Sequence, residues 1–156
     1  MTERLSLEEA RRILDAAVSE CERRGVKTAV AVVDDHGQIV AAARLDGARH
    51  YYADVAVGKA MSAAIFKEPS RSAGAWSAPA GTLPAAGSLA SMPRPPGGNG
   101  VQARVNQLHG NRIVYAPGAV PLYRDGVVIG AVGVGGSGPD GDESVAILAA
   151  KQLDAS

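Results

Sequence analysis

The chain has 156 residues, the length of one ordinary domain. Its 16 Lys and Arg residues balance 16 Asp and Glu residues without forming a basic block, which argues against nucleic-acid binding. No apolar run approaches the roughly 20 residues needed to cross a bilayer, and the N-terminal segment lacks the apolar core of a secretory signal. We therefore expect a cytoplasmic protein with no membrane partner.

The first third of the chain predicts a helix followed by two strands. Ser6 and Glu9 have the spacing of a capping box, and apolar residues then recur at three- and four-residue steps until Gly25, a residue suited to ending a helix. The stretch Val26–Val33 is rich in β-branched residues and predicts a buried strand, which a turn connects to a second strand at Gln38–Ala43.

A second helix is expected at Tyr51–Phe66, with a face of small residues that allows tight packing. From Pro69 to Gly100 prolines and glycines alternate, which indicates a long loop of the kind that is often functional. A short helical turn is expected around Ser70–Trp76, and residues 101–108 suit a short helix or strand.

The stretch Arg112–Gly136 predicts three strands, and Pro139–Leu153 predicts a final helix. Asp125-Gly126 is a strong hairpin signal, because the primed turns require positive φ at both central residues. With two hairpins and no regular βαβ alternation, the pattern favours an α+β fold: an antiparallel sheet of about five strands, flanked by helices.

Several motifs together resemble the GlcG/HbpS/PduO C-terminal domain family. The matching stretches are VKTAVAVVDDHGQIVAAARLDGA, DVAVGKAMSAAIF, NRIVYAPGAVPLYRDGVVIGAVGVGG and PDGDESVA. They occur in the family's order and cover most of the chain. The positions that match the family pattern are Asp34, Gly37, Asp46, Gly47, Lys59, Pro117, Gly118, Pro121, Gly130, Gly133, Gly135, Gly136, Asp142 and Glu143.

The resemblance implies a single domain over residues 1–156 with a profilin-like fold and helices on both sides of the sheet. It also implies a homo-oligomer, from a dimer to an octamer, and a small-molecule ligand such as haem, a corrinoid or another planar compound. The loop at about 69–100 is longer than is usual for the family.

The last predicted strand contains four glycines, which have no side chain to pack: Gly130, Gly133, Gly135 and Gly136. Glycine within a strand marks a bulge, a bend or the close approach of a backbone or ligand. We interpret these positions as the lining of a ligand pocket near a subunit interface. The amides of residues 135–138 suit an anion or an oxyanion, and the alternative is a flexible turn.

Lys59 lies among small residues of the second helix, where a buried ammonium would need an anionic partner. It could anchor a carboxylate or a haem propionate, act as a base, or form a structural ion pair with Asp46, Asp142 or Glu143. Asp142 and Glu143 near a helix N-terminus are expected to cap that helix.

The three histidines differ in setting. His36 and His109 are expected in exposed turns, whereas His50 precedes Tyr51 and Tyr52 at the start of the second helix. This His-Tyr-Tyr cluster offers an acid/base group and flat apolar surfaces for a planar ligand.

Three hypotheses follow: a small-molecule binding protein, an enzyme that uses the same pocket, or an assembly module whose glycines allow tight subunit packing. The enzyme would perform proton transfer, elimination or ring opening on a small organic acid. The predicted acid/base residues are His50, Asp54 and Lys59, and no metal ligand is assigned. The predicted ligand-binding residues are Arg44, Tyr51, Tyr52, Trp76, Gly135 and Gly136.

Overall fold

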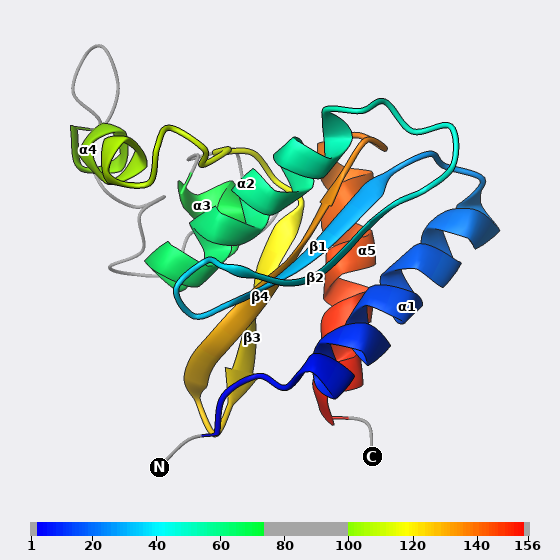
Figure 1. Cartoon of the computed structure of the whole chain (residues 1–156), viewed down its shortest axis with the longest axis horizontal. Helices are drawn as coiled ribbons and strands as arrows, with labels where there is room; N and C mark the ends of the chain where they lie inside the picture. The colour runs from blue at the N-terminus through cyan, green and yellow to red at the C-terminus, as the bar shows by residue number, and fades with distance from the viewer. Residues whose placement is uncertain (1–2, 74–99, 155–156) are drawn as a thin grey trace, which may run out of the picture.

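The computed structural model describes residues 3–73 and 100–154. It contains a four-stranded antiparallel sheet in the order β2-β1-β4-β3, with helices on both faces (Figure 1). The elements in chain order are α1 (Leu7–Arg24), β1 (Ala29–Asp34), β2 (Ile39–Arg44), α2 (Tyr52–Phe66), α3 (Ser70–Ala73), α4 (Gly100–Leu108), β3 (Ala119–Arg124), β4 (Val127–Gly135), α5 (Pro139–Ala150) and the 3-10 helix η2 (Lys151–Asp154).

The predicted ends of α1 are confirmed. The Ser6 side chain accepts a hydrogen bond from the Glu9 amide, and the Glu9 carboxylate accepts one from the Ser6 amide. Gly25 ends the helix in the left-handed region, at φ 71°. The buried stripe of α1 includes Cys21, whose thiol pKa is raised by burial, as befits a core residue.

The last turns of α1 carry an ion-pair cluster that predicts acid sensitivity. Hydrogen bonds from Arg23 and then Arg24 lower the pKa of Glu20 from 4.5 to about 2. A carboxylate with a depressed pKa stabilises the fold above its unfolded pKa, and this contribution disappears as the pH falls through the folded value. We expect the stability difference between wild type and Glu20→Gln to be present at pH 7 and mostly lost near pH 2, as urea unfolding at each pH would show.

The β3–β4 hairpin forms where the sequence predicts it. Asp125 and Gly126 both have positive φ, 52° and 77°, as a type I′ turn requires. β4 also pairs antiparallel with β1, with Val32 opposite Val132. The β3–β4 hairpin therefore lies beside the β1–β2 hairpin in one sheet. This pairing makes β4 and β1 the central strands and leaves β2 and β3 at the edges.

The two faces of the sheet carry different side chains. Val30, Val32, Val132 and Val134 join the main core with α1 and α5. Alanines such as Ala31 and Ala131 face α2 on the other side, so this helix lies close to the sheet. In Figure 1, α2 lies on one side of the strands, and α1 and α5 lie on the other. The predicted flanking of the sheet by helices on both sides is therefore confirmed.

In the described residues the sheet has four strands, where the sequence predicts about five. Residues 112–118, where the sequence predicts a further strand, adopt no regular secondary structure. The segment packs instead against Gly58 of α2, and its Ile113 amide donates a hydrogen bond to the Asn106 side chain, 2.9 Å away. The segment makes these contacts instead of pairing with a strand. Its β-branched residues favour a strand but are not sufficient to place it in the sheet.

Other predicted boundaries shift by a few residues. The first strand begins at Ala29, and the final helix ends at Ala150, where η2 continues the chain. The short helix expected after Pro69 is α3, whereas residues 74–99 of the predicted loop lie outside the described part of the chain. Residues 100–108 are helical in α4.

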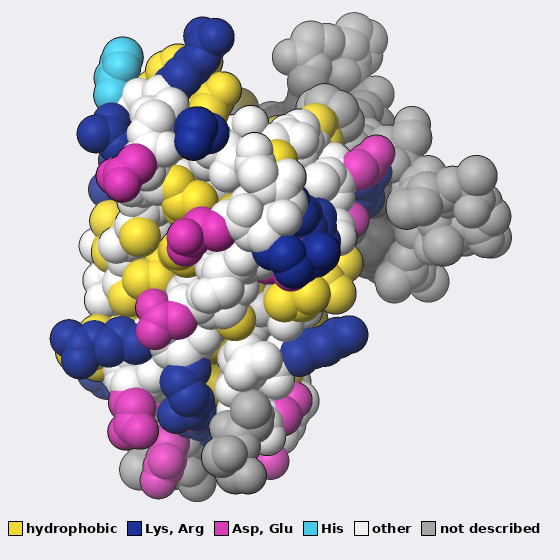
Figure 2. Space-filling view, turned by 90° about the vertical axis from the view of Figure 1, so that its right-hand side faces the viewer, with side chains coloured by type: hydrophobic (Ala, Val, Ile, Leu, Met, Phe, Trp, Pro, Cys, Tyr) yellow, Lys and Arg dark blue, Asp and Glu magenta, His cyan; other side chains and the backbone are white. Residues whose placement is uncertain are grey.

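Two surface properties follow from the described residues. None of the helices in residues 3–73 and 100–154 is long and apolar enough to span a membrane. On the face shown in Figure 2, basic and acidic side chains are interspersed, so this face presents no continuous positive field.

Candidate functional site

Lys59 forms a buried ion pair that joins α2 to α5. Its Nζ donates hydrogen bonds to Asp142 Oδ2 at 2.9 Å and to the Val134 carbonyl at 3.1 Å. The side chains of Lys59 and Asp142 are only 6% and 2% exposed. Of the settings that the sequence left open for Lys59, the structure places it in the ion pair with Asp142.

The amides that follow β4 also point at Asp142. Its Oδ1 accepts hydrogen bonds from the Ser137 amide at 2.9 Å and the Ser137 hydroxyl at 2.6 Å, and its Oδ2 accepts one from the Gly136 amide at 3.3 Å. The anion bound at this turn is therefore a carboxylate of the chain itself. Ammonium, amides and carboxylate together form one satisfied polar cluster in the interior.

The prediction of a glycine-lined pocket is wrong, because α2 packs on these glycines and fills the space beside them. A Cβ at Gly133 would lie 2.4 Å from the Ala56 carbonyl oxygen, and one at Gly135 would lie 3.0 Å from Val55 Cγ1. At Gly136 a Cβ would lie 2.7 Å from Tyr52 Cδ2. These three positions are thus covered by α2 of the same chain, because the helix can come this close to the strand only where the strand has no Cβ.

A hollow of about 430 Å³ lies instead on the outer side of α2, and we call it the α2 groove. Three segments form it: the start of β2, the first half of α2, and residues 111–114. The described residues that line it are Ile39, Tyr51, Asp54, Val55, Val57, Asn111, Arg112 and Val114. Its volume lies within the range of small-molecule sites, and apolar side chains predominate in its lining.

Glycine and asparagine residues fix one wall of the α2 groove. A Cβ at Gly58 would lie 2.5 Å from both the Arg112 carbonyl oxygen and Val114 Cγ2. The chain enters this wall through Gly110 and Asn111, at φ 71° and 58°. The wall therefore depends on one close approach to α2 and on two left-handed residues at its start.

The structure brings together only part of the predicted site. Tyr51 and Asp54 line the α2 groove, and the His50 ring contacts the Tyr51 ring edge-on, with centroids 5.7 Å apart. Tyr52 lies against Gly136 on the side of the sheet, although its ring also contacts Tyr51. Lys59, in its ion pair, is not among the described lining residues of the groove.

The remaining predicted residues lie elsewhere. Arg44 lines a second hollow, of about 480 Å³, together with Glu22, Lys27 and Asp46. Trp76 lies outside the described residues. Arg112, Asn111 and Val114 line the α2 groove although the sequence did not single them out. The Gly110-Asn111 turn before them was the available signal, since it marks a chain reversal.

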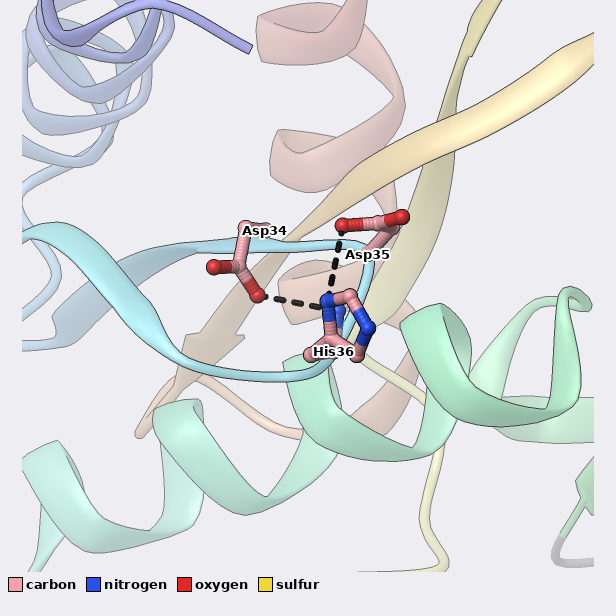
Figure 3. Close-up of side chains that lie close together, drawn as sticks. All are labelled: Asp34, Asp35 and His36. Carbon is pink, nitrogen blue, oxygen red and sulfur yellow. Dashed lines mark hydrogen bonds and ion pairs between the residues drawn. The ribbon is translucent and has the colours of Figure 1, made fainter. Parts of the chain in front are cut away.

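The β1–β2 turn contains the group of possible metal ligands found among the described residues, Asp34, Asp35 and His36 (Figure 3). One ligand atom from each lies within 4.8 Å of the others. Asp34 Oδ1 accepts hydrogen bonds from the amides of His36 and Gln38, and Asp35 contacts His36 Nδ1 at 3.2 Å. His36 is 79% exposed, as predicted for a turn histidine, and the hydrogen bonds of Asp34 account for the turn itself.

These features define the class of the protein: an antiparallel sheet between helical layers, with a buried ion pair between α2 and α5 and a groove beside α2. A family model described as "Haem degrading protein HbpS-like" matches residues 5–151. The chain belongs to this family, as the sequence motifs predicted.

Solved structures show the same fold. Protein ORFY of Klebsiella pneumoniae superposes with a TM-score of 0.76 at 22% identity, with 100% of this chain and 95% of that chain covered. A double mutant of HbpS from Streptomyces reticuli gives 0.73 at 24%, with 97% and 88% covered. A structure described as a PduOC:heme complex gives 0.74 at 22%, with 97% and 96% covered. The comparison with curated proteins finds no match.

Proposed function

We propose that the protein binds haem in the α2 groove. The observation that carries the proposal is the lining of this groove, in which aliphatic side chains and the Tyr51 ring are combined with the Arg112 guanidinium. The family description names haem, and so does the similar PduOC structure. Haem is flat, apolar on its faces and anionic at one edge, and the lining of the groove is consistent with such a ligand.

The lining residues fit the chemistry of haem. Ile39, Val55, Val57 and Val114 provide apolar surface for the macrocycle, whose burial is favourable by about 25 cal/mol per Å². Arg112 provides a cation for a propionate, and its Nε donates a hydrogen bond to the His109 carbonyl at 3.3 Å, which orients the guanidinium. Asp54 on the same lining would repel a propionate and so favours one orientation of the ligand.

Two side chains could bind the iron. Tyr51 lines the groove, and His50 packs against its ring. Phenolate and imidazole are both axial ligands of haem iron in proteins, and the bound group supplies the redox chemistry of its iron. We expect Tyr51→Phe or His50→Ala to shift the Soret band of the complex, and the variant that does so identifies the ligand.

The proposal is tested by titrating the ligand-free protein with haemin while following the Soret band and native mass spectra. We expect saturable binding of one haem per chain. A spectral change that grows linearly with haemin, without saturation or a retained haem mass, would show that the groove is not a haem site.

Arg112→Ala is expected to weaken haem binding about tenfold, because it removes the cation proposed to meet a propionate. The matched control is Arg104→Ala, which removes a cation from exposed α4 where its guanidinium contacts Gln107. Haem dissociation constants for both variants would check this. Equal affinity in wild type and Arg112→Ala would remove Arg112 from the site.

A further inference from the structure

Asn106 of α4 binds the chain on both sides of Arg112, the cation of the α2 groove. Its backbone carbonyl accepts a hydrogen bond from the Asn111 amide at 2.8 Å, and its side-chain Oδ1 accepts one from the Ile113 amide at 2.9 Å. A backbone amide can only donate, so the side-chain atom that faces Ile113 is the oxygen. One residue of α4 therefore fixes the backbone both before and after Arg112.

The first of these hydrogen bonds belongs to the cap that ends α4. Together with the Gly110 amide, which donates to the Gln107 carbonyl at 3.2 Å, it forms a Schellman motif. Gly110 takes the left-handed conformation that this motif requires, at φ 71°. The chain thus leaves α4 in a fixed direction, and Figure 1 shows it passing along α2 before it reaches β3.

The hydrogen bond from Ile113 to the Asn106 side chain is not part of this cap. It joins residues that are seven positions apart, and Ile113 is only 6% exposed. A buried amide that loses its acceptor costs more than an exposed one, because water does not replace the lost partner. The Asn106 side chain therefore holds the chain beyond the end of the helix, at the point where the groove wall begins.

The Arg112 side chain is oriented by the same end of α4. Its Nε donates a hydrogen bond to the His109 carbonyl at 3.3 Å, where the helix dipole favours a cation. No carboxylate within residues 3–73 and 100–154 forms an ion pair with this guanidinium, so its two terminal nitrogens are free to meet a ligand. The Arg112 carbonyl lies against Gly58 of α2, which fixes the residue from the other side.

We propose that Asn106 is a positioning residue, which holds the Arg112 guanidinium at the α2 groove so that the groove recognises a carboxylate of its ligand. Asn106 is not among the described residues that line the groove, so it acts through Arg112. A guanidinium that is held in place before binding loses less conformational entropy when the ligand arrives. The role in ligand recognition rests on the proposed haem function, whereas the positioning of Arg112 is a property of the ligand-free protein.

Asn106→Ala tests the positioning without any ligand, because it removes Oδ1 but keeps the backbone carbonyl of the Schellman motif. We expect the Ile113 amide to exchange with solvent about tenfold faster and the Arg112 Nε–H signal to show greater motion by NMR relaxation. Asn106→Asp keeps an oxygen acceptor at this position and is expected to keep the exchange rate of wild type. The matched control is Gln107→Ala, which removes an exposed amide that accepts a hydrogen bond from Arg104 at 3.4 Å and should change neither signal.

Haem affinity tests whether Asn106 acts through Arg112. We expect Asn106→Ala to weaken haemin binding about fivefold, less than the loss in Arg112→Ala, because the cation is still present but no longer held. In the Arg112→Ala background the same change is expected to cause no further loss, as a double-mutant cycle would show. The dimethyl ester of haemin has no free carboxylate, so wild type and Asn106→Ala should bind it equally.

The possible outcomes separate this proposal from the haem proposal. Unchanged exchange of Ile113 and unchanged motion of Arg112 in Asn106→Ala would overturn the positioning role, and so would an equal effect of Gln107→Ala, which would indicate a general loosening of α4. A loss of haemin affinity that is as large without the Arg112 side chain would show that Asn106 acts by another route. If wild type fails to bind haemin, the haem proposal is overturned, while the ligand-free measurements still decide whether Asn106 positions Arg112.

Discussion

Lys59→Met is expected to lower the free energy of unfolding by about 3–5 kcal/mol. The substitution keeps most of the length of the side chain and removes its charge. Asp142 then remains as a buried carboxylate whose cationic partner is gone, and the Val134 carbonyl loses a donor. An unpaired buried charge costs far more than a lost surface ion pair, so the effect on stability is large.

Urea unfolding of wild type and variant gives this difference directly. The matched control is Glu8→Gln, because Glu8 forms an i,i+4 pair with Arg12 and is 88% exposed. We expect that control to change stability by less than about 0.5 kcal/mol. A loss below about 1 kcal/mol in Lys59→Met would show that the cluster is hydrated in solution rather than sealed.

The double variant Lys59→Met/Asp142→Leu separates the cost of an unpaired charge from the value of the pair. Removing both charges often restores stability, since the desolvation of each ion is then avoided. Here the recovery is expected to be partial, because the amides of Gly136 and Ser137 lose their acceptor as well. Full recovery would show that water can replace Asp142 at these amides.

Gly133→Ala is expected to destabilise the protein by about 3 kcal/mol. The new Cβ would lie 2.4 Å from the Ala56 carbonyl oxygen and 2.9 Å from the Ala60 amide nitrogen. Both are backbone atoms of α2, so relief requires the whole helix to move from the sheet. Such a movement also loosens the alanine contacts on this face and shifts the groove wall that α2 carries.

Gly100→Ala is the control for this prediction. Gly100 begins α4, and among the described residues nothing beyond its chain neighbours and its own helix backbone lies within 4 Å of its would-be Cβ. Alanine has the better helix propensity there, so stability should be unchanged or slightly raised. Thermal unfolding of both variants measures the contrast, and equal melting temperatures would mean that α2 does not pack on β4 as closely as described.

The glycine pattern shows how a local signal can be read correctly and assigned to the wrong partner. Glycines in β4 do mark a close approach, as the sequence predicted. The approaching group is α2, whose small residues Ala56 and Ala60 lie four positions apart and meet the strand at Gly133. The sequence shows both the glycines of β4 and the small residues of α2. No local pattern, however, predicts that the strand near residue 133 faces the helix near residue 56.

The features that were predicted correctly from the sequence depend on interactions between residues that are close together in the chain. The capping box at Ser6, the left-handed Gly25 and the Asp125-Gly126 turn each depend on a few adjacent residues, and each forms as predicted. The family was predicted from the resemblance of several motifs. The antiparallel sheet and the order of the helices and strands, apart from the strand expected at residues 112–118, follow from local patterns. For these features, local conformational preference and hydrophobic periodicity are sufficient.

Only the tertiary structure decided where these elements meet. Lys59 and Asp142 are 83 residues apart, and the packing of α2 and α5 against β4 selects their pairing from the several that the sequence left open. The α2 groove likewise draws on β2, α2 and residues 111–114, of which the sequence singled out only Tyr51 and Asp54. Contacts across such distances are selected by the packing of the whole chain, because many pairings satisfy the local rules and only one fills the core.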